Sequence, residues 1–481
     1  MTQTLERLPG LVEELNDFER YQTYEEIRAS MRAIVASVPV DADGNSHMHI
    51  EEIGRASDRS AEYPDGRPIE AIFASTPGTE NTRPWVILEM EHENELPPTL
   101  AMLLVAKVIA KHPEILDELG LNLVIIPATH PDGIALQRWA WEGGEFNPLK
   151  YLQGLFRSAP AEQITWGFPF QYEHMGFNNP SAENLAIMAL RRRLKARSMH
   201  SLHGNVVGDA FTIGTSNDEA FFKAYRRVVE LYGFRMQAVP EDEIFVRHND
   251  AYPGMYKPVT VRDSIHASFP GQPVREMSWE GFGGDSSYGF MASEVAEPEY
   301  LATEFPYMDA PDAHDHTTTN ITAAEATQEM LEFTGLLIEM TRNKLKLLRP
   351  AVANSNSPEV ARLVRSLEWW IPYKQRQLAA SRTRQHEAGS SRMLTKAEYF
   401  SKVIWKLYDT GLAGQVGSLA RELGNAKVQA EVAGEVEQRW TAFKEKHELI
   451  PYELKKIVGA QALGSLVALV HSKERPQNQQ A

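Results

Sequence analysis

The chain has 481 residues, which is enough for about two to four domains of ordinary size. Charged residues make up 24% and hydrophobic residues 43%, values typical of a globular protein and not of a disordered or fibrous one. Acidic residues outnumber basic ones 65 to 49, for a net charge of -16, which argues against a nucleic-acid-binding protein. Because the chain has no cysteine, disulfides, iron–sulfur clusters and a cysteine nucleophile are excluded, and any metal must be held by His, Asp and Glu.

The N-terminus carries no targeting signal that we recognise. It lacks the basic and apolar regions of a signal peptide, and no apolar run approaches 18 residues. We therefore expect a cytoplasmic protein without a membrane partner.

The predicted elements begin with a helical segment over residues 9–38 and a turn-rich stretch from Asp41 to Gly66. Near-continuous apolar runs then indicate strands that are buried on both faces. Helices are predicted between and after these strands, as in a βαβ unit. The strands are expected at 69–73, 85–90, 121–126, 199–202 and 288–295, and the helices at 99–119, 181–196 and 221–232.

Beyond about Thr318 the pattern becomes helical, with few strand signals. The expected fold is therefore α/β, with a mixed, mostly parallel sheet flanked by helices, plus a C-terminal all-helical region. The predicted divisions are a helical lead-in (1–45), an α/β catalytic domain (46–318) and a helical domain (319–481). The helical domain would either cover the site or mediate self-association as a homo-oligomer.

The strongest chemical signal is the sequence His-Glu-Asn-Glu at 92–95, directly after the apolar run 85–90. Ligands of open α/β sheets bind at the carboxyl ends of strands. The spacing of His92 and Glu95 lets one turn bring an imidazole and a carboxylate to one ion, a pair that suits zinc. The alternative for this short motif is a solvated turn.

Further polar groups follow the other predicted strands. They are His-Pro-Asp-Gly at 130–133, the pair His200 and His203, and Glu294 after the run that starts at Tyr288. Their order resembles that of the zinc metallocarboxypeptidase family (the carboxypeptidase A-like and deacylase superfamily). In that family a His-x-x-Glu motif is followed by Asn-Pro-Asp-Gly, a histidine that closes a strand, and a late glutamate. The resemblance covers about residues 65–300.

The resemblance implies that His92, Glu95 and His203 hold Zn²⁺ and that Glu294 is the general base. His200 competes with His203, but two residues three apart on a strand face opposite sides, so one of them alone would reach the ion. Glu294 has an alternative reading as an exposed acid. The resemblance also implies an oxyanion-binding arginine, and Tyr288 as a substrate-binding residue.

Between residues 96 and 190 the sequence offers two arginines, Arg138 and Arg157. Arg138 is favoured as both a catalytic and a substrate-binding residue, and its alternative is a surface arginine packed on Trp139 or Trp141.

The Asn-Arg pair that binds a terminal carboxylate in the family is missing. An aromatic stretch occupies 140–180 instead, which predicts packing first and an apolar substrate pocket second.

The sequence therefore predicts a zinc-dependent hydrolase that cleaves a peptide or small amide by metal-activated water. A deacylase of acylated amino acids and a non-catalytic binding protein with the same fold are the alternatives. A nucleotide-binding glycine motif and a Gly-x-Ser-x-Gly elbow are absent from the sequence. The His-Asp-His run at 314–316 is interpreted as a linker.

Overall fold

The computed structural model describes residues 2–40, 46–141, 143–144, 146–240, 245–268, 273–274, 283–387 and 391–472. Within these ranges an eight-stranded mixed sheet has the order β1-β2-β4-β3-β7-β10-β8-β9. The central strands β4, β3, β7 and β10 are mutually parallel, and β1, β2 and β8 add antiparallel pairs. The strands are β1 (Met48–Arg55), β2 (Pro68–Ala74), β3 (Trp85–Glu89), β4 (Asn122–Ile126), β7 (Ser198–Asn205), β8 (Phe211–Gly214), β9 (Met255–Tyr256) and β10 (Glu299–Pro306).

The apolar strands are buried on both faces because helices cover both sides of the sheet. On β3, Val86 and Leu88 pack in the core on the side of α3, whereas Ile87 packs in the core on the side of α7. The helices on the first side are α1 (Thr2–Leu15), α2 (Tyr24–Ala36), α3 (Leu96–Lys111), α8 (Glu219–Leu231) and α16 (Leu454–Ser472). Those on the other side are α7 (Ala182–Leu194) and α10 (Ser287–Glu294).

The expected fold class is confirmed. The strands expected near 69–73, 85–90, 121–126 and 199–202 are β2, β3, β4 and β7. The strand expected at 288–295 is wrong, since these residues belong to helix α10, whose first turn is capped by the hydroxyl of Ser286. The strand that follows is β10, which begins at Glu299.

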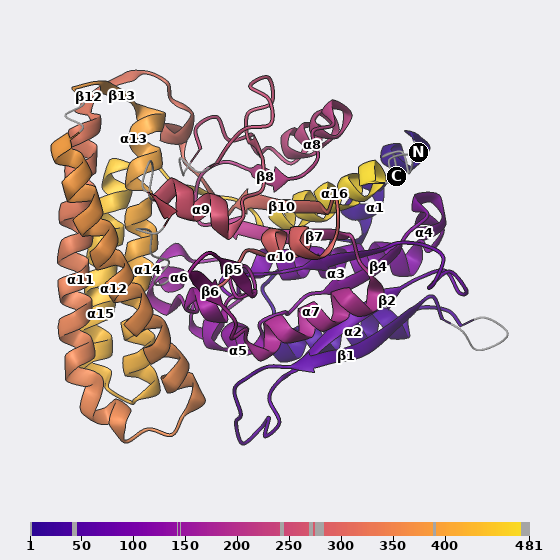
Figure 1. Cartoon of the computed structure of the whole chain (residues 1–481), viewed down its shortest axis with the longest axis horizontal. Helices are drawn as coiled ribbons and strands as arrows, with labels where there is room; N and C mark the ends of the chain where they lie inside the picture. Colours follow the sequence, from indigo (N-terminus) through magenta and orange to yellow (C-terminus); the bar gives the residue numbers. More distant parts are fainter. Residues whose placement is uncertain are drawn as a thin grey trace.

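The helical region stands beside one end of the sheet (Figure 1). Helix α14 contacts α11, α12 and α15, and it also packs against α6 of the α/β part. A Cβ at Gly414 would overlap the carbonyl oxygen of Leu152, so glycine allows α14 to lie close to α6. These helices are α6 (Pro148–Gly154), α11 (Ala323–Ala353), α12 (Pro358–Glu387), α13 (Lys396–Val403), α14 (Trp405–Glu422) and α15 (Ala426–Lys446).

After the helical region the chain returns to the α/β part. Helix α16 packs against α3, α8 and α1, so the end of the described chain lies beside its beginning (Figure 1). In length and composition α16 is the one described helix that could cross a membrane, but 78% of its most apolar window is buried in the fold. The three-part division predicted from sequence stays a prediction, and this helix completes the sheet's apolar layer.

Candidate metal centre and its pocket

Three neighbouring parallel strands end at the same edge of the sheet and deliver polar side chains there. His92 and Glu95 lie in the turn between β3 and α3, and His203 lies near the end of β7. Glu304 on β10 is paired in register with His203. Because in-register neighbours point to the same face, these four side chains converge.

Three side chains present donor atoms to one another at this edge. The Nδ1 of His92 lies 2.8 Å from Oε1 of Glu95 and 3.0 Å from Nδ1 of His203. The Nδ1 of His203 lies 3.2 Å from Oε2 of Glu95. Zinc–ligand bonds of about 2.0–2.2 Å place tetrahedral ligands about 3.3–3.5 Å apart, so small movements would fit these donors to one ion. The set of two imidazoles and one carboxylate therefore fits a divalent metal.

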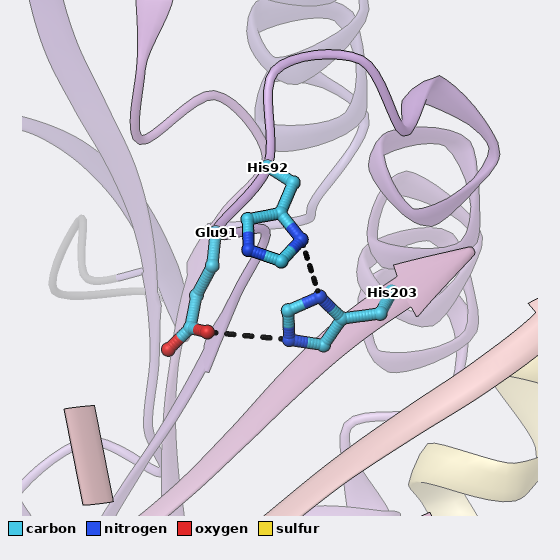
Figure 2. A group of neighbouring side chains, drawn as sticks. All are labelled: Glu91, His92 and His203. Carbon is cyan, nitrogen blue, oxygen red and sulfur yellow. Dashed lines mark hydrogen bonds and ion pairs between the residues drawn. The ribbon is translucent and has the colours of Figure 1, made fainter. Parts of the chain in front are cut away.

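Glu91 is a second carboxylate at the two histidines. One oxygen of Glu91 and one nitrogen from each of His92 and His203 lie within 4.8 Å of one another (Figure 2). Its Oε2, however, lies 3.2 Å from Nε2 of His203, the ring nitrogen opposite to the one that faces Glu95. The lone pairs of the two ring nitrogens diverge, so an ion bound through Nδ1 of His203 would have Glu95 as its carboxylate ligand, and Glu91 would then orient the His203 ring.

Burial and neighbouring charges shift the pKa values of the two histidines in opposite directions. Burial, with Arg157 nearby, lowers the pKa of His92 to about 4, so its ring is neutral at pH 7. Burial also opposes the charged form of His203, but hydrogen bonds with Glu91 and Glu95 outweigh it and raise the pKa of His203 well above its usual value. A cation at the cluster would therefore displace a proton from His203.

The two histidines of β7 face opposite sides of the sheet, as the alternation of a strand requires. His200 lines a separate small cavity with Ala468 and His471 of α16. His203 is the one that meets His92 and Glu95. The backbone of His203 is also held from α16, because the side-chain amide of Gln461 donates to its carbonyl oxygen.

The cluster opens into a cavity of about 350 Å³ between the sheet edge and the helical region. One wall carries His92, Glu95, Arg157 and Glu304 from the α/β part. Trp166 is the residue of the aromatic stretch that lines the cavity, while Tyr151, Phe156 and Phe168 are buried packing residues. The helical wall is supplied by α12 and α14, in the form of Trp370, Lys374, Trp405, Tyr408, Asp409, Leu412 and Gln415.

Glu304 and Arg157 line the cavity beside the cluster, whereas the catalytic residues predicted from the sequence were Glu294 and Arg138. Oε1 of Glu304 lies 3.9 Å from Nδ1 of His203, and its side chain is 18% exposed. Arg157 donates from one Nη to Asn94 Oδ1 at 2.8 Å and to Glu95 Oε1 at 3.2 Å. The guanidinium is thus held beside the metal ligands while it still lines the cavity.

The structure does not bring the other expected residues to this cavity. Glu294 ends α10 and pairs with Arg192 at 2.6 Å. Arg138 pairs with Glu422 and lies over the ring of Trp139, as in its alternative reading. Tyr288, on α10, packs against Tyr300 of β10, with ring centroids 5.8 Å apart.

The motif His-Pro-Asp-Gly belongs to a buried ion network behind the metal ligands. His130 Nδ1 lies 3.2 Å from Glu93, the residue that follows His92, and the backbone N–H of Ser158 donates to Glu93. Arg362 of α12 is 2% exposed and reaches this network, where it lies 2.7 Å from His130 Nε2 and 2.6 Å from Asp58. The network ties the helical region to the turn that carries the cluster.

Sequence reasoning missed Glu91, Glu304 and the cavity role of Arg157. Glu304 had a usable signal, since a short run rich in apolar residues (299–306) follows Pro298 and contains this acid near its end. Arg157 had no local signal, because contacts with α12, more than 200 residues later, hold its segment in place.

No family model and no curated protein matches the sequence. Solved structures do match part of it. A metallo-carboxypeptidase from Burkholderia cenocepacia is 16% identical over 60% of this chain and 61% of its own, with a TM-score of 0.34. Carboxypeptidase A from Helicoverpa armigera is 14% identical over 64% and 72%, also at 0.34. Bovine thrombin-activatable fibrinolysis inhibitor is 11% identical over 60% and 86%, at 0.33.

These matched structures are carboxypeptidases or a carboxypeptidase relative, and each likeness covers part of this chain. The roles of individual residues are assigned from the geometry of this chain.

Proposed function

We propose that the protein is a zinc-dependent hydrolase of an amide or peptide bond. His92, Glu95 and His203 would hold the ion, which supplies an acidified water and a Lewis acid for the substrate carbonyl. The observation that carries the proposal is the convergence of these three donors within 3.2 Å, although His203 lies 108 residues after Glu95.

Glu304 takes the role of general base in this proposal. Its carboxylate lies beside His203 and faces the cavity, so it can accept a proton from water that attacks a carbonyl there. It can then return the proton to the departing amine. Glu294 is too firmly engaged with Arg192, on a helix outside the cavity wall, to do this.

Arg157 takes the role of carbonyl-polarising cation. A guanidinium that is already held by Asn94 and Glu95 does not have to reorganise when negative charge develops on the carbonyl oxygen. The hydroxyl of Ser366 and the indole N–H of Trp370 donate to the carbonyl of Arg157 at 2.5 and 3.4 Å. Both donors come from α12, so the helical region supports the catalytic wall.

The volume of the cavity favours a small substrate. A volume of about 350 Å³ with a wall of α12 and α14 suits an amide the size of an acylated amino acid or a dipeptide. This size supports the deacylase alternative more than it supports cleavage at the terminus of a folded protein.

The test is turnover by the zinc-loaded, full-length protein on a panel of N-acyl amino acids and short peptides, with Glu304→Gln as the inactive control. Zinc-dependent release of an amine that disappears in the variant supports the proposal. Absence of turnover on the whole panel, at one bound zinc per chain, overturns it.

A further inference from the structure

A second hollow adjoins the cavity of the candidate metal centre. It is a groove of about 690 Å³ in the helical region, lined by residues of α11, α12 and α13. Trp370, Lys374, Trp405 and Asp409 line both the groove and the cavity. The two spaces therefore meet along these four side chains.

Trp370 connects the groove to the wall that carries the candidate catalytic groups. Its indole N–H donates to the carbonyl oxygen of Arg157 at 3.4 Å, and the Arg157 guanidinium donates to Glu95 at 3.2 Å. Two residues thus span the distance from a metal ligand to the groove. A long substituent on an amide bound at the cluster would therefore lead toward the groove.

Much of the groove wall is apolar. Met330 and Leu331 of α11, Leu378 of α12, Trp405 and Pro240 all line it. Leu378 and Met330 keep part of their surface exposed there, although both side chains are apolar. Covering this surface with an apolar ligand would remove it from water, which is favourable.

Most polar side chains of the groove already donate hydrogen bonds within the protein. The donors that have such internal acceptors are Thr327, Thr334, Lys374, Gln377, Arg392 and Ser401. An extended peptide carries an N–H and a C=O group at almost every residue, and these groups need hydrogen-bond partners of their own. A linear aliphatic chain has no such groups, so the groove suits an aliphatic chain better than a peptide.

We infer that the groove binds the aliphatic chain of an N-acyl substrate whose amide lies at the metal cluster. This inference rests on the proposed hydrolase function and adds the substrate class: an amide with a linear acyl chain that is too long for the cavity alone. The charges of Lys374 and Asp409 offset each other across 2.8 Å, so this pair presents no net charge to the chain. The cavity of about 350 Å³ then holds the amide and its amino part.

The kinetic test varies the acyl chain on the zinc-loaded, full-length protein. The substrates are acetylglycine, butanoylglycine, octanoylglycine and decanoylglycine. The value of kcat/KM should rise about 2–4-fold for each added methylene that enters the groove, as for partial to full burial of a methylene. A value that stays constant or falls beyond butanoylglycine overturns the inference. So does a tetrapeptide, Ala-Ala-Ala-Gly, that is cleaved as efficiently as octanoylglycine.

A substitution in the groove tests where the chain binds. Leu378→Glu places a charge on the apolar wall and should lower the ratio of octanoylglycine to acetylglycine kcat/KM by at least about 10-fold. The matched control is Leu347→Glu on α11, where the leucine is 61% exposed and lies outside the groove wall, and it should keep the wild-type ratio. If Leu378→Glu fails to fold, Leu378→Ser removes apolar surface without adding a charge. A wild-type ratio in a folded Leu378 variant overturns the inference.

A binding measurement separates this inference from the proposed function. Titration with 1-butanol and 1-octanol, followed by the fluorescence of the tryptophans, needs no turnover. Octanol should bind at least about 16-fold more tightly, at about 2-fold or more for each of its additional methylenes, and Leu378→Glu should remove most of the difference. If this result is found but no substrate is hydrolysed, the hydrolase proposal fails and the groove site stands. If substrates are hydrolysed but the difference is missing or survives Leu378→Glu, the groove site is overturned and the hydrolase proposal stands.

Discussion

The hydroxyl of Ser366 lies 2.5 Å from the carbonyl oxygen of Arg157, across a separation of 209 residues. This contact joins a helix of the C-terminal region to the segment that carries the cationic group of the candidate active site. The wall of the cavity that carries Arg157 is therefore hydrogen-bonded directly to the helical wall.

Arg157→Met is expected to lower kcat by about 10²–10³-fold, because a preorganised donor to the developing negative charge is lost. Arg138→Met is the matched control, since Arg138 pairs with Glu422 and lies outside the cavity wall. Steady-state kinetics on zinc-loaded protein measure both. Equal losses in the two variants would contradict the assignment.

Glu304→Gln is expected to keep the metal and lose about 10²–10⁴-fold in kcat, the usual contribution of a general base. Glu294→Gln should leave kcat unchanged, because Glu294 pairs with Arg192 at the end of α10. Metal content and turnover should be measured on the same preparations. A large loss for Glu294→Gln with none for Glu304→Gln would restore the base expected from sequence.

His92→Ala and His203→Ala are each expected to weaken zinc binding by more than the roughly 10–100-fold that is typical of losing an outer partner, because a direct ligand is removed. His200→Asn should retain zinc, since His200 faces a different cavity. Elemental analysis after dialysis gives the stoichiometry. Zinc retained at one equivalent in both alanine variants would refute the cluster as a metal site.

Arg362→Met is expected to destabilise the fold by at most about 3–5 kcal/mol, because it removes a buried cation shared by Asp132 and Glu183, although Asp132 keeps its ion pair with Arg67. Arg365→Met, three residues later and 45% exposed in its side chain, should cost less than about 1 kcal/mol. Urea denaturation measures both. Similar costs for the two would show that the network does not hold the regions together.

The His-Asp-His run gives a pH prediction through His314. Burial opposes its charge, but hydrogen bonds with Asp209 and Asp309 raise the pKa of His314 to about 9. A raised folded-state pKa stabilises the fold fully below about pH 6.5, and this contribution is lost as pH rises to about 9. We expect a loss of about 1 kcal/mol over this interval, after allowance for solvent screening. His314→Gln should flatten the profile, which urea titrations at pH 6 and pH 9.5 would detect.

The sequence predicted most central strands because their apolar runs are buried on both faces, which leaves a strong local signal. It also predicted the meeting of His92, Glu95 and His203, since the ends of parallel strands share an edge. The run 288–295 was wrongly predicted as a strand, because a short apolar segment fits a strand and a buried helix equally well. Because of this error, the predicted general base, Glu294, lies on α10, and Glu304 on the following strand β10 was not considered.

The sequence offered Arg157 as one of two arginines without favouring it, and it gave no signal for Lys374. Their positions depend on Ser366, Trp370 and Asp409, which belong to helices that lie far away in the sequence. The local sequence periodicity of α12 does not show which of its faces packs against the α/β part, because packing between the two regions determines this.

The return of α16 to the sheet has a consequence for synthesis. Residues 454–472 must be synthesised before α16 can pack against α3 and bind the backbone of His203. The bundle of α11 to α15 will already have emerged by then, although all eight strands of the described sheet precede it in the chain. The sheet therefore stays only partly covered, with part of its apolar layer exposed, until α16 has been translated some 250 residues after His203.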